Sequence, residues 1–187
     1  MNVKKLILST VLTAALFSTA LIRANHTEPS NPTPVVENDD KKTVVGVAAS
    51  NDNFSTLVAA IQAADLVSTL NSEGPFTVFA PNNEAFAKLP DGTLETLLKA
   101  ENKKTLTSIL TYHVVAGKFM ASDVLEAIKK NNGSFDISTV NGEKLTASLK
   151  DGKVMLKDSK GNFSEIILTD IGASNGVIHA IDTVVMP

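Results

Sequence analysis

Residues 74–90 carry the clearest structural pattern of this 187-residue chain and read GPFTVFAPNNEAFAKLP. A Gly-Pro pair breaks the preceding helical pattern and Pro81 closes a short apolar run, so Phe76–Ala80 is predicted to be a strand. Asn82 or Asn83 is a typical helix N-cap, and a short helix is expected to follow. This stretch therefore places one strand inside a half of the chain that is otherwise helical.

The segments on either side of this stretch have two different periods. Apolar residues recur at helical spacing before and after it, and strand-like runs separated by Asn-Gly and Asp-Gly turns follow residue 133. The predicted helices contain Phe54–Ile61, Leu66–Leu70, Leu94–Leu98, Leu106–His113 and a last helix through Ile128 with Ser122 as its N-cap. The fold class is therefore predicted as α+β, with helices first and an antiparallel β region last. That order argues against a parallel doubly wound sheet.

Three motifs of the chain together resemble the fasciclin-like domain. The stretch at residues 74–90 resembles its first signature, NGVIHAIDTVVMP at 175–187 resembles its second, and YHVV at 112–115 resembles the segment between them. The resemblance covers nearly all of residues 43–187. It implies a fasciclin-like β-sandwich wrapped by an N-terminal set of helices, used as a secreted or surface-attached module in adhesion and matrix interactions. It does not imply an enzyme.

The residues before this domain indicate export. Residues 1–24 combine two early lysines with an uncharged run from Leu6 to Ile22, which is typical of a signal peptide cut after Ala20 or Ala24. An uncleaved membrane anchor is the alternative. Residues 25–42 are polar and Pro-rich and are predicted to be a tether. We therefore expect a secreted, periplasmic or cell-surface protein.

Composition excludes several kinds of chemistry. The chain has no cysteine, which excludes disulfides and thiolate sites, and its formal charge of −3 makes nucleic acid a poor partner. Its histidines, His26, His113 and His179, lie in separate regions with no ligand spacing. Neither a metal site nor a cofactor is predicted.

One catalytic pattern is present by chance. Residues 172–176 read GASNG and match the G-x-S-x-G nucleophile elbow. That motif requires a strand-to-helix turn with an acid and then a histidine downstream, whereas here His179 precedes Asp182 and a strand-like run follows Gly176. We interpret the pattern as a turn and predict no enzymatic activity.

Two pairs of residues are candidates for partner binding. Tyr112 and His113 belong to the segment that adhesive contacts use in relatives, and Tyr112, the only tyrosine, could present an amphipathic ring. Asp170 and Ile171 lie where animal fasciclin-like domains have a proposed integrin-contacting pair. Packing explains the same residues and is the favoured interpretation of both pairs: a core histidine that closes a helix, and an apolar strand end beside a turn aspartate.

Four residues of the second signature are predicted to be structural. His179 shares a strand face with apolar residues, so a buried, neutral ring bonded to the backbone is expected. Asp182 falls on the opposite face, which makes a His–Asp dyad awkward. Asn175 and Gly176 form a tight turn.

Two functions remain open from the sequence. The first is a non-catalytic extracellular or cell-surface adhesion or protein-interaction module, whose partner is an extracellular or cell-envelope protein or a matrix component. The second is a secreted or periplasmic carrier that binds an apolar small molecule, of the lipid or carotenoid class, between the helices and the sheet. The oligomeric state is left open.

Overall fold

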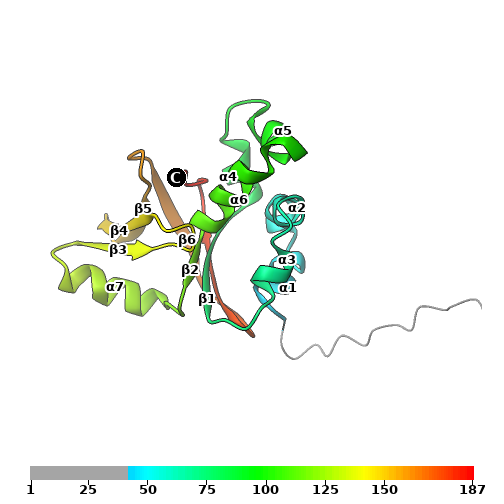
Figure 1. The fold of residues 1–187 in the computed structure, drawn as a ribbon. Coiled ribbons are helices and arrows are strands. Elements are labelled where there is room, and N and C mark those ends of the chain that lie inside the picture. The colour runs from blue at the N-terminus through cyan, green and yellow to red at the C-terminus, as the bar shows by residue number, and fades with distance from the viewer. Residues whose placement is uncertain (1–41) are drawn as a thin grey trace, which may run out of the picture. The chain divides into compact units, whose positions relative to one another are not determined.

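The computed structural model describes residues 42–187, in which helices predominate up to residue 130 and five strands follow one another after it (Figure 1). The predicted signal peptide and all of the predicted tether except Lys42 lie outside the described residues. The helices are α1 (Val44–Ala49), α2 (Ser55–Ala63), α3 (Val67–Leu70), α4 (Asn83–Ala87), α5 (Thr93–Leu98), α6 (Lys103–Tyr112) and α7 (Ala121–Lys130), with 3₁₀ turns at Asp52–Phe54 and Ala100–Asn102. The strands are β1 (Phe76–Pro81), β2 (Val114–Ala116), β3 (Ser134–Ser138), β4 (Lys144–Lys150), β5 (Lys153–Lys157), β6 (Phe163–Ala173) and β7 (Gly176–Ile181).

All of these strands belong to one sheet, in the order β2-β1-β7-β6-β5-β4-β3. The pairs are antiparallel except β1 with β7, which run parallel. The long strand β6 joins two halves, because it pairs with β5 at its start and with β7 further along. The two ends of the sheet meet through a single bridge between Val115 and Thr139. A nearly closed, barrel-like sheet therefore takes the place of two stacked sheets.

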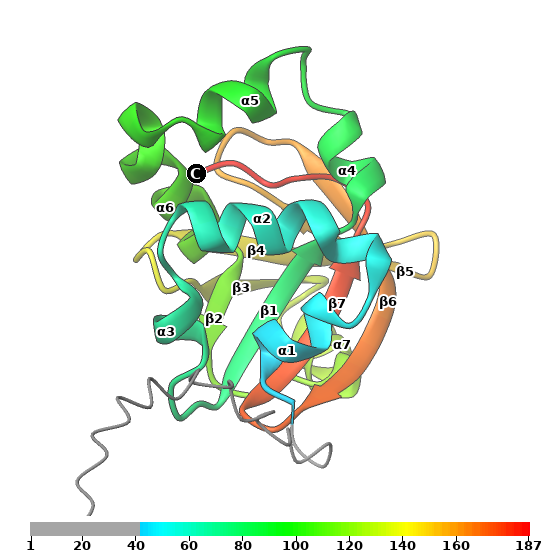
Figure 2. The same cartoon turned by 90° about the vertical axis from the view of Figure 1, so that its right-hand side faces the viewer.

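The β1–β7 half of the sheet separates two apolar cores. Helices α1, α2 and α3 cover its outer face (Figure 2), where Val78 and Ile178 pack against Leu57 and Ile61. Its inner face contributes a second cluster, which Phe79 and Ile181 form together with strands β3–β5 and helix α7. Burial on both faces explains why β1 and β7 read as continuous apolar runs.

The predicted α+β class is confirmed, and so is the helix cap at Asn82, whose side chain accepts the Ala85 N–H at 2.8 Å. The predicted cap at Ser122 is wrong, because the last helix begins earlier, after Met120. Two carboxylates supply this cap. Asp123 accepts the Met120 N–H at 3.0 Å, and Asp170 accepts the Ala121 N–H at 2.9 Å.

Candidate functional site

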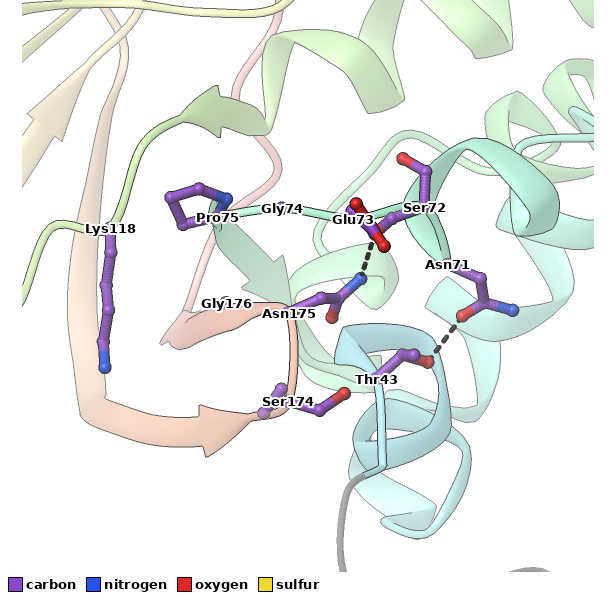
Figure 3. Close-up of a pocket in the computed structure, with 11 residues that line it drawn as sticks. Thr43, Asn71, Ser72, Glu73, Gly74, Pro75, Lys118, Ser174, Asn175 and Gly176 are labelled. Carbon is purple, nitrogen blue, oxygen red and sulfur yellow. Dashed lines mark hydrogen bonds between the residues drawn. The ribbon is translucent and has the colours of Figure 1, made fainter.

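The two signature motifs meet where strands β1 and β7 begin (Figure 3). The strands lie parallel with Phe76 opposite Gly176, and the Phe76 N–H donates to the Asn175 carbonyl at 3.0 Å. The peptide bond between Gly74 and Pro75 is cis. We call this contact between residues 70–76, the start of α1 and residues 174–176 the Asn175 joint.

Two glycines allow the close approach of the backbones at the joint. A Cβ on Gly74 would overlap the Asn175 carbonyl oxygen, and a Cβ on Gly176 would overlap the Phe76 carbonyl oxygen. Both obstacles are backbone atoms that cannot rotate away. Glycine is required here for space and not for an unusual φ, since neither has a positive value.

Asn175 holds the surrounding segments together. Its amide nitrogen donates to the carbonyls of Leu70 at 2.7 Å and Ser72 at 2.9 Å, and its side-chain oxygen accepts the Val44 N–H at 2.9 Å. One side chain thus ties the end of α3 and the start of α1 to the β6–β7 turn. Among uncharged side chains, only the amide of Asn or Gln offers two N–H donors together with an acceptor.

A groove of about 490 Å³ opens beside the joint. Eleven residues line it, which we call the joint groove: Thr43, Asn71, Ser72, Glu73, Gly74, Pro75, Lys118, Ala173, Ser174, Asn175 and Gly176. Figure 3 shows Lys118 across the groove from Thr43 and Asn71. Within the described chain, no hydrogen bond or ion pair uses the Glu73 carboxylate, the Lys118 ammonium group or the Ser174 hydroxyl. These three exposed groups are therefore available to a ligand.

The structure places the predicted binding residues Tyr112 and His113 in the interior, 0% and 2% exposed. The Tyr112 hydroxyl donates to the Lys144 carbonyl at 2.8 Å, and burial raises the pKa of this hydroxyl. The His113 ring bonds to Ile109 and Val185. Neither side chain is exposed to a partner at the surface, because both are buried and bonded to backbone groups.

Asp170 and Ile171 lie at the surface end of β6. Asp170 is exposed, has a positive φ of 60° and caps α7 through the Ala121 N–H. Ile171 is half-buried against the helical core. Asp170 therefore has a structural partner, and its exposed side chain remains open to a further contact.

His179 is 1% exposed and stacks on Phe79 with ring centroids 5.7 Å apart. Its Nδ1 accepts the Asp170 N–H at 3.2 Å, and its Nε2–H donates to the Phe119 carbonyl at 2.8 Å. The predicted burial with backbone bonding is what the structure shows. One nitrogen accepts and the other donates, which is the pattern of a neutral ring.

Asp182 lies at the end of β7 and joins β6 to α4. Its carboxylate accepts the Glu165 N–H at 2.8 Å and bonds the Lys88 ammonium group at 2.9 Å. Burial alone would raise the pKa of Asp182, but the hydrogen bonds from Lys88, Glu165 and Thr183 outweigh it and hold the pKa below its ordinary value. No bond connects it to His179.

Sequence reasoning identified Asn175 and Gly176 and missed the rest of the groove. Glu73 directly precedes the first signature, so the sequence could have indicated that it lies beside the joint. No sequence pattern indicates the same for Lys118, because it comes from the loop between β2 and α7. Among residues 42–187, no cluster of metal-ligating side chains and no helix long and apolar enough to cross a membrane is found.

This fold and its two joined signatures define a fasciclin domain. The fasciclin domain family model matches residues 52–187, so the chain belongs to this family. Over 78% of the chain, the fold also matches the structure of a FAS1 domain pair from the insect cell adhesion molecule Fasciclin I, with a TM-score of 0.69, 20% sequence identity and 51% of that chain covered.

Individual relatives come from bacteria and animals. The chain is 50% identical over 168 residues to protein sll1483 of Synechocystis, covering 90% of this chain and 86% of that protein. It is 37% identical over 165 residues to immunogenic protein MPB70 of Mycobacterium bovis, with 84% and 77% covered. It is 41% identical over 145 residues to transforming growth factor-beta-induced protein ig-h3 of the pig, covering 78% of this chain but 19% of that protein.

Proposed function

We propose that the chain is a non-catalytic adhesion or protein-interaction module that acts outside the cytoplasm and binds its partner through the joint groove. Membership of the fasciclin family supports the class of function, since the insect neighbour is described as a cell adhesion molecule. The partner is an extracellular or cell-envelope protein or a matrix component.

The observation that carries this proposal is a set of exposed polar side chains that form no hydrogen bond or ion pair within the described chain and lie beside a backbone held by hydrogen bonds. Glu73 and Lys118 present opposite charges and Ser174 a hydroxyl, while the backbone beside them is fixed by the Asn175 hydrogen bonds. A preformed site loses little conformational entropy on binding. The charges match a partner segment that carries one cationic and one anionic side chain.

Charge reversal in the groove tests this proposal. A strain that lacks the gene is complemented with the wild type, with the E73K/K118E double variant, or with the control E126K/K130E. The control reverses an exposed ion pair on α7, away from the groove. We expect the wild type and the control to restore surface attachment and biofilm formation and the groove variant to fail, at unchanged melting temperature. Full restoration by the groove variant would contradict the proposal.

Export supports the same function and is tested separately. The basic start, the uncharged run and the Pro-rich segment of residues 1–42 lead us to propose cleavage after Ala20 or Ala24. N-terminal sequencing of protein from the periplasm or medium reads the cleavage site directly. An uncut product that stays in the cytoplasm would exclude an extracellular role.

The alternative function, a carrier of an apolar small molecule, would use a cavity that is small in this structure. An apolar cavity lies between the helices and the sheet, lined by residues of α1, α2, α3, β1 and β7 that include Val44, Ile61 and Ile178. Its volume is about 10 Å³, which is close to the space that one water molecule needs. A lipid or carotenoid therefore requires α1 to move away. Organic extraction of purified protein tests this alternative, because a bound pigment or lipid would be recovered.

A further inference from the structure

The last residues of the chain are held by side chains instead of strand pairing. After β7, residues 183–187 form no helix or strand, and we call them the C-terminal strap (Figure 2, ending at the C label). Its N–H groups donate to three side chains: that of Thr183 to Ser164 Oγ at 3.2 Å, that of Val185 to His113 Nε2 at 3.3 Å, and that of Met186 to Asp158 Oδ2 at 3.1 Å.

The strap covers apolar surface. Val184 belongs to the helical core and Val185, 1% exposed, to the barrel core. Because the strap lacks ladder hydrogen bonds, its attachment depends on these two valines, on the three side-chain acceptors and on two serine hydroxyls. Ser164 donates to the Thr183 carbonyl at 2.8 Å and Ser159 to the Met186 carbonyl at 3.4 Å. In the described chain the bond from Val185 to His113 is the one hydrogen bond in the middle of the strap, so its loss weakens the attachment there.

His113 differs from the other two acceptors because it has a single lone pair to offer. Its Nδ1 lies 2.8 Å from the Ile109 carbonyl oxygen, which can only accept, so Nδ1 carries the proton and Nε2 is the bare nitrogen. A second proton converts Nε2 into a donor. It would then point an N–H at the Val185 N–H, while the bond to Ile109 would remain intact.

We propose that the C-terminal strap is an acid-released latch, in which protonation of His113 at Nε2 detaches Val185 and uncovers the apolar surface beneath the strap while the rest of the domain stays folded. Burial lowers the pKa of His113 to about 4, which keeps the latch closed at neutral pH. The fixed bond from Nδ1 to Ile109 confines the change to the strap side of the ring.

Other titratable groups lie on the segments around His113. Tyr112 precedes the ring on α6, and the charges of Glu143 and Asp158 act on Tyr112. Asp158 also bonds the strap at Met186, and Asp182 directly precedes the strap. No hydrogen bond or ion pair in the described chain joins any of them to the ring. Asp158 is the one that also holds the strap, and its carboxylate accepts N–H groups from Lys160, Asn162 and Met186. It is therefore the competing trigger.

Amide hydrogen exchange on the full chain between pH 7 and pH 3 tests the latch. Protection factors, taken relative to an unstructured peptide at each pH, separate opening from the chemistry of exchange. We expect the Val185 and Met186 amides to lose protection by at least about tenfold, with the midpoint at the pH where the His113 ring titrates by NMR. The amides of Ile178 and Ala180 in β7 should keep their protection.

Two variants assign the trigger. In H113Q the side-chain amide offers an acceptor that does not titrate, so the strap should stay protected at acid pH. In D158N the amide oxygen still accepts from Met186, while the amide nitrogen replaces the oxygen that bonds the Lys160 and Asn162 N–H groups. Once strap protection at pH 7 shows that the variant is attached, release at acid pH should persist. Release in H113Q, or its loss in D158N, overturns the proposal. So does simultaneous loss of β7 protection in the wild type. If H113Q does not fold, the wild-type comparison between ring titration and strap release still decides.

Discussion

The Asn175 joint and the C-terminal strap both attach a segment to the domain through side chains, but they use different chemistry. At the joint, an uncharged amide bonds two carbonyls and one N–H, and two glycines let the backbones touch. At the strap, a histidine and a carboxylate accept N–H groups. Only the second arrangement changes with pH. The joint should therefore be a constant anchor of the fold and the strap a conditional one.

The largest effect is expected at the glycine of the joint. In G176A the added Cβ meets the Phe76 carbonyl oxygen, so β1 and β7 must separate and both cores are disturbed. We expect a loss of about 4 kcal/mol or more in the free energy of unfolding, or no folded protein. Urea denaturation measures it.

The matched control is G172A in β6. Gly172 has no atoms within 4 Å of an added Cβ and no positive φ. It should fold with wild-type stability to within about 1 kcal/mol. Equal stability of G176A and G172A would mean that the close approach at the joint is not required.

The amide of Asn175 is expected to rank next. In N175D the group that donated to the Leu70 and Ser72 carbonyls becomes a carboxylate oxygen, which repels both. Replacing two hydrogen bonds by an unpaired, partly buried charge should cost about 3–4 kcal/mol. N132D is the control, since Asn132 also precedes a glycine but is exposed. A thermal melt of N175D that matches N132D would remove Asn175 from its central role.

The sequence predicts the joint better than the groove, for physical reasons. Asn175-Gly176 and Gly74-Pro75 are local turn signals, and the alternation around His179 is enough to predict its burial. That β1 pairs in parallel with β7 follows from tertiary packing, which no local pattern contains. Lys118 reaches the groove only through that packing.

Two short elements show how tertiary contacts override propensity. Helix α1 contains two adjacent valines and a glycine, which disfavour helix, yet its first N–H groups are capped by Thr43 and by the Asn175 side chain. Strand β2 has three residues and no alternation to detect. An amphipathic ring such as that of Tyr112 is compatible with a surface or a core. Its hydroxyl can be buried here because it donates to the Lys144 carbonyl, a contact that the local sequence does not predict.

The strap should make stability depend on pH through His113. Its pKa is about 4 when folded and near the ordinary value of 6.5 when unfolded, so the unfolded chain binds more protons between these values. Stability is therefore complete above about pH 6.5 and falls as the pH drops toward 4. We expect the wild type to lose about 3 kcal/mol more than H113Q between pH 7 and pH 4. Parallel pH profiles of the two proteins would show that His113 does not titrate in this way.

The smallest effect is expected at the exposed ion pair where the strap begins. Lys88 and Asp182 lie 2.9 Å apart, but their side chains are 51% and 34% exposed, so solvent screens the attraction. K88A should cost about 0.5 kcal/mol, and the difference should shrink further in ~1 M salt. D182A should cost more than K88A, because the carboxylate also accepts the Glu165 N–H and the Ser164 hydroxyl.

The lowered pKa of Asp182 means that its contribution to stability is present above the ordinary carboxyl pKa and is lost as the pH falls through the folded value. It therefore stays constant across the range in which His113 acts, and K88A should leave the pH profile between 7 and 4 unchanged. A K88A profile that follows H113Q would place the conditional anchor at the surface pair instead of the buried ring.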